Sequence, residues 1–127
     1  DLREGLSIHK WVYPGDRLTL VTAVLTMMFV PVEARYRVLS DIHRHLELDG
    51  AFIMVEKVIG EGPAMDELLV CQHEAFKARQ GCTDDDLEGV LVPLQLSSHI
   101  ANLKAVGFTH VDTFWRCLNF VGIIAVK

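Results

Sequence analysis

The sequence lacks the glycine-rich signatures with which many α/β proteins hold a nucleotide. Its 127 residues contain no Gly-x-Gly-x-x-Gly pattern and no P-loop motif. The segment Gly60-Glu61-Gly62-Pro63 is interpreted only as a turn, because a proline follows where a helix amide would be needed to bind phosphate. This chain therefore does not contain the glycine loop that such proteins place after a first strand.

The sequence also has few cysteines, no excess of basic residues and no long apolar run. The three cysteines, Cys71, Cys82 and Cys117, are odd in number and lack metal-ligand spacing, which favours reduced thiols in a cytoplasmic protein. Twelve basic and 17 acidic residues leave a net charge of −5, which argues against broad nucleic-acid backbone binding but leaves a local basic patch open. The longest apolar run, residues 21–32, is too short to span a bilayer, and the start carries no leader pattern.

The residues that are present describe an ordinary globular chain. Half of them are apolar and 23% are charged, and the sequence contains no internal repeat, low-complexity tract or linker. We therefore expect residues 1–127 to form a single domain with a buried core.

The first part of the chain predicts a strand-helix-strand unit. Residues 18–25 are apolar and rich in branched side chains, as in a strand buried on both faces. Pro31 suits the first position of a helix that ends near residues 48–50, and residues 51–55 form a second buried strand. The right-handed crossover rule makes the two strands parallel, with Glu56 and Lys57 at the edge where ligands bind in such sheets. The apolar face of the helix is expected to consist of Tyr36, Leu39, Ile42, His43 and Leu46.

The second part predicts a helical insert and a terminal pair of strands. A helix is expected over residues 64–80 with Gly81 as its cap, followed by a short helix over 83–88 and a loop over 90–96. Ser97 and Ser98 are expected to cap a last helix over 98–105, which closes on Gly107. Residues 109–114 and 119–127 then form two strands, bridged by the short segment 115–118.

Several polar groups have both a functional and a structural interpretation. The six histidines show no metal-ligand spacing and no metal site is expected, although His73 lies on the inserted helix that should cover the ligand edge. The acidic run 84–86 is typical of a solvated helix start. An arginine patch on the first helix is either a phosphate site or a solvated helix face, and it comprises Arg35, Arg37 and Arg44. Met27, Met28 and Phe29 form either core or pocket wall. Trp115 and Arg116 belong to the core, to an interface or to a substrate contact.

Four segments carry a resemblance to a known family. They are residues 48–57 (LDGAFIMVEK), 72–77 (QHEAFK), 103–108 (LKAVGF) and 114–120 (FWRCLNF). With this order of elements, the chain resembles the second half of a class I S-adenosylmethionine-dependent methyltransferase. More narrowly, it resembles the carboxy-S-adenosyl-methionine synthases, which act in wobble-uridine modification of transfer RNA. The resemblance implies the C-terminal half of a Rossmann-like sheet with parallel strands, an antiparallel last strand and a helical insert after the second strand.

The resemblance also implies positions for a cofactor, S-adenosylmethionine or a derivative of it. Asp1, Leu2 and Arg3 match the family's acidic loop beside the cofactor adenine. Residues at the end of the first strand match the surroundings of the methionyl part, namely Ala23, Val24, Leu25 and Thr26. The candidates for the substrate rim are Lys57, His73, Lys77, Arg79, Trp115 and Arg116.

Two departures from the family pattern keep two functions open. The first three strands, the glycine loop and the ribose-binding acidic residue have no counterpart, and the chain is several residues shorter after Leu87, where the family has a basic segment. The first hypothesis is a cofactor-binding transferase, with catalysis mainly by alignment and with transfer RNA as a partner only by resemblance. The second is a non-catalytic module that acts through oligomerisation, because loss of three strands would expose a sheet edge.

Overall fold

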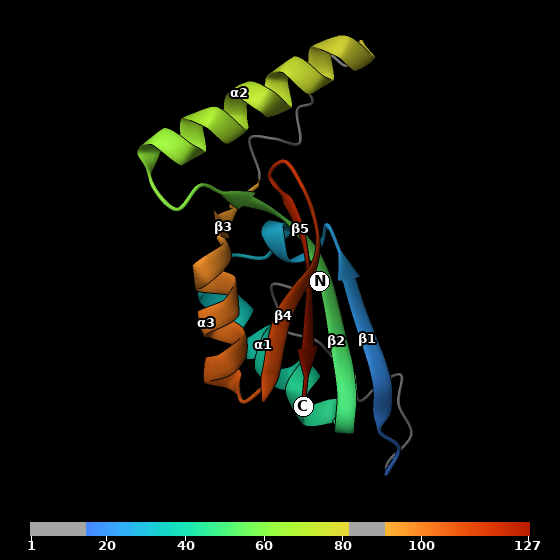
Figure 1. The fold of residues 1–127 in the computed structure, drawn as a ribbon. Coiled ribbons are helices and arrows are strands. Elements are labelled where there is room, and N and C mark those ends of the chain that lie inside the picture. Colours follow the sequence, from blue (N-terminus) through green and yellow to red (C-terminus); the bar gives the residue numbers. More distant parts are fainter. Residues whose placement is uncertain (1–14, 82–90) are drawn as a thin grey trace.

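A computed structural model describes residues 15–81 and 91–127 and shows a mixed sheet with helices on one face (Figure 1). Its elements in chain order are β1 (Leu18–Val24), the 3-10 turn η3 (Met27–Phe29), α1 (Val32–His45), β2 (Leu46–Ile59), α2 (Pro63–Gln80), β3 (Leu94–Gln95), α3 (Leu96–Val106), β4 (His110–Cys117) and β5 (Phe120–Val126). The strand order is β1-β2-β5-β4, and the short β3 pairs with the end of β2. β1 and β2 are parallel, and β5 is antiparallel to both of its neighbours. This confirms the predicted architecture, including the antiparallel last strand and the helical insert.

The core forms where α1 and α3 pack side by side against one face of the sheet. Side chains of β2 alternate, and Phe52, Met54 and Val58 point into this layer. They meet Ile42 of α1 and Leu103 of α3, and all five are at most 2% exposed. Burial of such large apolar side chains contributes roughly 1.5–3 kcal/mol each, so this layer supplies most of the stabilisation.

The strand predictions were right in kind but wrong in extent. β1 is not buried on both faces, because Leu20 and Val24 are 52% and 58% exposed. The reason is its position at the edge of the described sheet, with helices on one face only. β2 begins at Leu46, so α1 ends at His45 and not near Gly50. The strand also runs past Glu56 to Ile59, because the apolar alternation continues through Val58.

The predicted apolar face of α1 was wrong at two positions. Tyr36 is 55% exposed, whereas Arg35 is 2% exposed and lies in the helical layer. Arg35 is four residues before Leu39 and seven before Ile42, so it shares their stripe. Of the arginine patch, only Arg37 and Arg44 remain on a solvated face.

The C-terminal elements also differ locally from the predictions. α3 begins at Leu96 with Gln95 at its N-cap, and no side-chain cap forms, so the predicted serine caps were wrong. The insert helix runs from Pro63 to Gln80 with Gly81 as its C-cap, as its pattern predicted to within one residue. Trp115 and Arg116 lie within β4 and not in a bridge, since the hairpin turn is made by Leu118, at φ 52°, and Asn119. The helix predicted over 83–88 falls outside the described residues.

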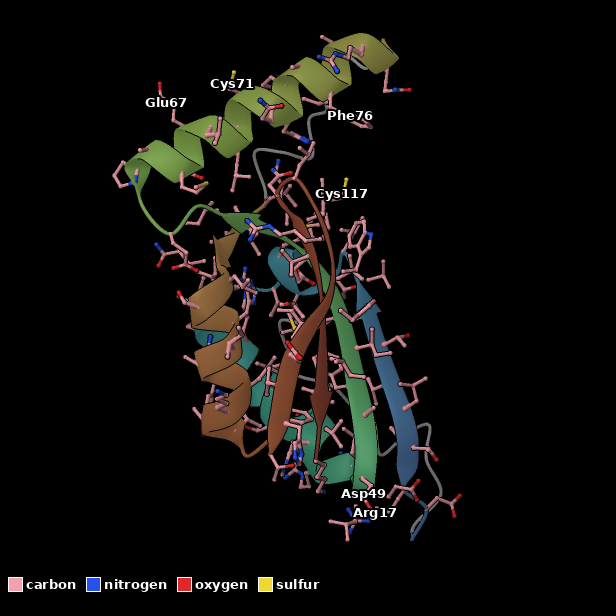
Figure 2. The ribbon with its side chains drawn as sticks, viewed as in Figure 1. Arg17, Asp49, Glu67, Cys71, Phe76 and Cys117 are labelled. Atoms are coloured by element: carbon pink, nitrogen blue, oxygen red, sulfur yellow. The ribbon has the colours of Figure 1, made fainter. Side chains whose placement is uncertain are left out.

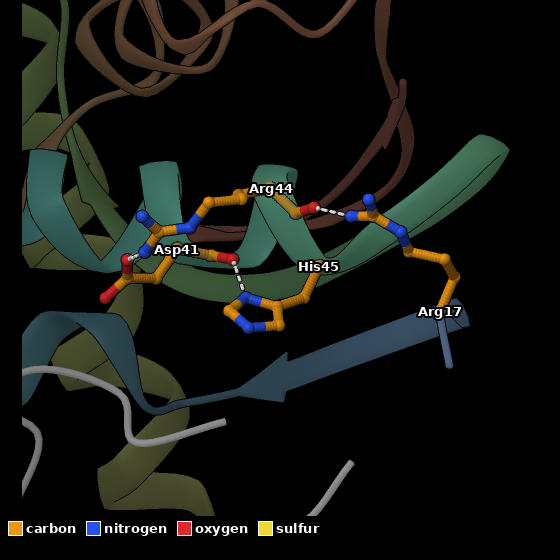
Figure 3. A network of polar contacts seen from close by, with 4 residues as sticks. All are labelled: Arg17, Asp41, Arg44 and His45. Carbon is orange, nitrogen blue, oxygen red and sulfur yellow. Dashed lines mark hydrogen bonds and ion pairs between the residues drawn. The ribbon is translucent and has the colours of Figure 1, made fainter. Parts of the chain in front are cut away.

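The C-terminal end of α1 is closed by cations from two other parts of the chain. Arg17 donates to the Arg44 carbonyl, and Lys127 Nζ donates to the His43 and Leu46 carbonyls at 2.7 and 2.8 Å. Figure 3 shows the Arg17 contact beside the Arg44–Asp41 ion pair and the bond between His45 Nδ1 and the Asp41 carbonyl. Positive charge at a helix C-terminus complements the helix dipole, so these contacts tie β1 and β5 to α1.

Helix α2 stands beyond the end of the sheet toward which β1 points (Figure 1). Figure 2 places Cys117 at this same end of the sheet, and Arg17 and Asp49 at the opposite end. Among the residues of α2 only Leu69 is buried, whereas Met65, Leu68 and Phe76 are about half exposed. The insert therefore stands beyond the end of the sheet where β1 ends, but it packs little against the described strands, and the helical face predicted for it is largely open.

Gly107 offers a test of how α3 is joined to the sheet. It lies at φ 118°, and a Cβ there would meet the His43 ring at 3.2 Å. We expect Gly107→Ala to lower the free energy of unfolding by about 1–2 kcal/mol, because the left-handed conformation is unfavourable for any other residue. Urea unfolding measures this. Gly62→Ala is the control, since a Cβ at Gly62 has no neighbour within 4 Å. Equal urea midpoints for the two variants would contradict the left-handed backbone conformation of Gly107.

Candidate functional site at the carboxyl ends of β1 and β2

The chain leaves β1 through a tight and strained turn. Leu25 has φ 49°, a left-handed conformation that non-glycine residues rarely adopt. Its amide donates to the Val55 carbonyl at 2.8 Å, and the Thr26 hydroxyl donates to the Val24 carbonyl at 2.9 Å. Strained backbone of this kind persists only where its surroundings hold it, and it clusters at functional sites.

A buried carboxylate lies directly beneath this turn. Glu56 is 1% exposed, and its Oε1 accepts from the Met27 amide at 2.9 Å and from the Thr26 amide at 3.4 Å. Its Oε2 accepts from the Met28 amide at 2.8 Å. Burial raises the pKa of Glu56, while the three amides and the nearby Arg35 oppose that rise. The carboxylate thus acts as the N-terminal cap of η3, although it comes from another strand.

Arg35 binds the other end of the same turn. Its Nε donates to the Val30 carbonyl at 2.8 Å, and its Nη2 donates to the Met28 and Val92 carbonyls at 3.3 and 2.6 Å. The Val92 amide in turn donates to the Met28 carbonyl at 3.1 Å. Burial lowers the pKa of Arg35, and the charges of Glu56 and Glu33 oppose this. Arg35 therefore joins the turn to the chain segment that leads into β3.

His99 completes a buried polar group behind the turn. It is 5% exposed on α3, and burial, with a smaller effect of Arg35, lowers its pKa to about 4. Within the described residues, His99 Nε2 and Arg35 Nη1 have no hydrogen-bond partner. A neutral imidazole is therefore held in the core next to a guanidinium.

The residues matched to the methionyl part of the cofactor all lie at this turn. Val24 and Leu25 are 58% and 41% exposed, and Thr26 is half-buried. Ala23 points the other way and packs against the core, so it offers only its backbone to the outside. Asp1, Leu2 and Arg3 lie outside the described residues.

The rim candidates are only partly brought together. Lys57 is in register with Phe120 of β5, and the His73 ring packs edge-on against Phe120 with centroids 5.7 Å apart. Lys77 forms an ion pair with Glu74 of its own helix at 2.9 Å, and Arg79 is exposed in the last turn of α2. Lys57 and His73 therefore both lie next to Phe120, while Lys77 and Arg79 follow His73 along α2.

Arg116 lines a pocket beside the first turn of α2. The pocket has a volume of about 550 Å³ and mostly apolar walls, which include Ile59, Pro63, Met65 and Leu96. Glu61 also lines it, and its carboxylate accepts from the Ser97 amide at 2.9 Å and the Ser97 hydroxyl at 2.7 Å. These bonds, with a smaller effect of Arg116, lower the pKa of Glu61. Trp115 is 46% exposed in β4 and does not line this pocket.

The sequence analysis missed the inward position of Glu56 and Arg35. Period-two alternation along β2 could have indicated the burial of Glu56, since it follows Phe52 and Met54 on the inner face.

Met27 belongs to the core cluster, which decides in favour of core between the two interpretations of this residue, while Phe29 is 41% exposed. Residues 15–81 and 91–127 contain no group of three or more potential metal ligands and no helix long and apolar enough to cross a membrane.

Comparison with known proteins finds relatives of one family. No family model matches the chain. Relatives named carboxy-S-adenosyl-L-methionine synthase are 38% identical in Methylococcus capsulatus, over all of this chain, and 37% identical in Staphylococcus epidermidis, over 84% of it. The chain spans about half the length of these curated relatives, 52% and 50%.

Solved structures show the same fold at low sequence identity. A putative O-methyltransferase from Nostoc punctiforme superposes with a TM-score of 0.63 at 16% identity, over 89% of this chain and 32% of its own. Human N-acetylserotonin methyltransferase in complex with SAM superposes with a TM-score of 0.60 at 12% identity, over 92% of this chain and 31% of its own. The sheet is therefore that of the methyltransferase fold.

His99 predicts a specific dependence of stability on pH. Its pKa is about 4 in the folded chain against 6.5 when unfolded, so the unfolded state binds more protons between these values. Stability should therefore fall by up to about 3 kcal/mol as the pH drops from 6.5 to 4. His99→Gln should remove this part of the pH dependence in urea unfolding, whereas the exposed His110→Gln should keep it. An unchanged slope in His99→Gln would contradict the buried neutral imidazole.

Proposed function

This chain is a homologue of the C-terminal half of the carboxy-S-adenosyl-L-methionine synthases, and on that kinship we propose that it is part of an S-adenosylmethionine-dependent transferase. The observation that carries the proposal is the turn after β1. Val24 and Leu25 are exposed there, Leu25 has a strained backbone, and hydrogen bonds to the buried Glu56 hold the turn in place. The carboxyl ends of strands are where α/β sheets of this kind bind ligands. Residues 1–127 are proposed to form a single, partial domain of the methyltransferase type.

The residues present fit one end of the cofactor. The turn over Ala23–Thr26 supports a site for the methionyl part, and Asp1, Leu2 and Arg3 are proposed to lie beside the adenine. The glycine loop and the ribose-binding acidic residue have no counterpart in this sequence, so the chain by itself offers only part of the site. The bound cofactor would supply an electrophilic sulfonium, and the protein would contribute mainly alignment of the reactants.

The rim of the site is proposed to receive the group acceptor. Lys57 and His73 lie near Phe120 at the ligand edge, and Arg116 offers a cation on the wall of the apolar pocket. Lys77, Arg79 and Trp115 are proposed to extend this rim from α2 and β4. The family resemblance supports a carboxymethyl-type or one-carbon transfer in transfer RNA modification, and the cysteine usage supports a place in the cytoplasm.

A second candidate function is a non-catalytic module that acts through oligomerisation. β1 lies at the edge of the described sheet, and Leu20 and Val24 on it are more than half exposed. Uncovered apolar edge strands tend to pair with another chain. α2 adds further exposed apolar side chains at the same end, including Leu68 and Phe76.

Cofactor binding tests the first function. We expect isothermal titration to show binding of S-adenosylmethionine, and Val24→Arg to weaken it at least tenfold, about 1.4 kcal/mol, because the bulky cation occupies the end of β1. Leu48→Arg is the matched control, since Leu48 is 80% exposed near the start of β2, next to Asp49 at the opposite end of the sheet (Figure 2). Absence of heat at high protein concentration would contradict cofactor binding by this chain.

Light scattering tests the second function. We expect a dimer or larger assembly, and Leu20→Lys should shift it toward the monomer, because a charge on the edge strand opposes pairing. A wild-type chain that is monomeric at high micromolar concentration would contradict this alternative.

A further inference from the structure

The carboxylate of Glu56 has no part in the function proposed so far, although it lies directly under the proposed cofactor turn. It occupies an inward position of β2, in line with Phe52 and Met54, and is 1% exposed. Burial of a carboxylate is strongly unfavourable unless hydrogen bonds or an opposite charge compensate it. Its partners therefore indicate what it does.

Those partners are the backbone amides of one turn. Glu56 binds the donors at the start of that turn, with its shortest contacts at 2.8 and 2.9 Å to the Met28 and Met27 amides. Arg35 binds the acceptors at its end, the carbonyls of Val30 and Met28, at 2.8 and 3.3 Å. A buried anion and a buried cation thus hold opposite ends of a turn of about six residues.

The turn needs such support because its first residue is strained. Leu25 at φ 49° lies one residue before the first amide that Glu56 accepts. Strained backbone persists only when neighbouring contacts over-determine it. The bond from the Leu25 amide to Val55 fixes one side of the strained residue, and Glu56 fixes the other.

We propose that Glu56 is a positioning residue of the cofactor site: its carboxylate holds the turn over residues 25–28 in the conformation that presents Val24, Leu25 and Thr26 to the ligand. The proposal rests on the function proposed above. Because Glu56 is 1% exposed and its carboxylate accepts from the amides of Thr26, Met27 and Met28, it is proposed to act through the turn and not by contact with the ligand.

Two measurements on the full chain test this role. The first is amide hydrogen exchange at residues 26–28, and the second is the Kd for S-adenosylmethionine by isothermal titration. In Glu56→Gln an amide group faces the backbone donors and accepts fewer bonds, so we expect at least tenfold faster exchange and at least tenfold weaker binding. Glu67→Gln, an exposed carboxylate on α2, should change neither quantity.

A second variant separates positioning from general stability. Ile42→Val removes one methylene from the core of α1 and should lower stability, while exchange at residues 26–28 and the Kd stay near wild type. Protected amides at residues 26–28 in Glu56→Gln would overturn the proposal, and so would wild-type affinity in that variant. A wild-type chain with protected amides but without binding would instead contradict the proposed function.

Discussion

The carboxylate of Glu56 is the interaction on which the ligand edge of this sheet depends. It accepts from three consecutive amides, at Thr26, Met27 and Met28, and so joins β2 to the chain that leaves β1. Three amide donors toward one carboxylate form a concentrated positive potential, comparable to a helix N-terminus. Because the group is buried, these bonds act in a low-dielectric environment, where the loss of any of them is costly.

The rest of the polar interior is arranged around this contact. Arg35 compensates the charge of Glu56 and binds the carbonyls at the far end of the turn, and through Val92 it connects to the segment before β3. His99 stays neutral beside it, which avoids a second buried cation. The apolar layer formed by Phe52, Ile42 and their neighbours excludes water from these groups. The core and the candidate site therefore meet at the turn after β1, where Met27 belongs to the core cluster and its amide binds Glu56.

The sequence predicted the order of elements well because that order follows from apolar periodicity. The parallel β1–β2 pair, the insert helix with its Gly81 cap and the terminal hairpin were all confirmed. The buried polar residues were harder to predict, since charge was taken as a sign of exposure. Arg35 lies on the same helical stripe as Leu39, and Glu56 on the same strand face as Met54, so geometry, not residue type, decided their burial. Which backbone groups they bind depends on a turn that periodicity does not describe.

The most direct test is to map S-adenosylmethionine on the chain by NMR. Backbone amide shifts would be followed during titration of the cofactor into uniformly labelled protein. The account predicts that the largest changes occur at residues 24–28, with smaller ones at Lys57. Changes confined to the Arg116 pocket, or to the opposite end of the sheet near Asp49, would contradict it.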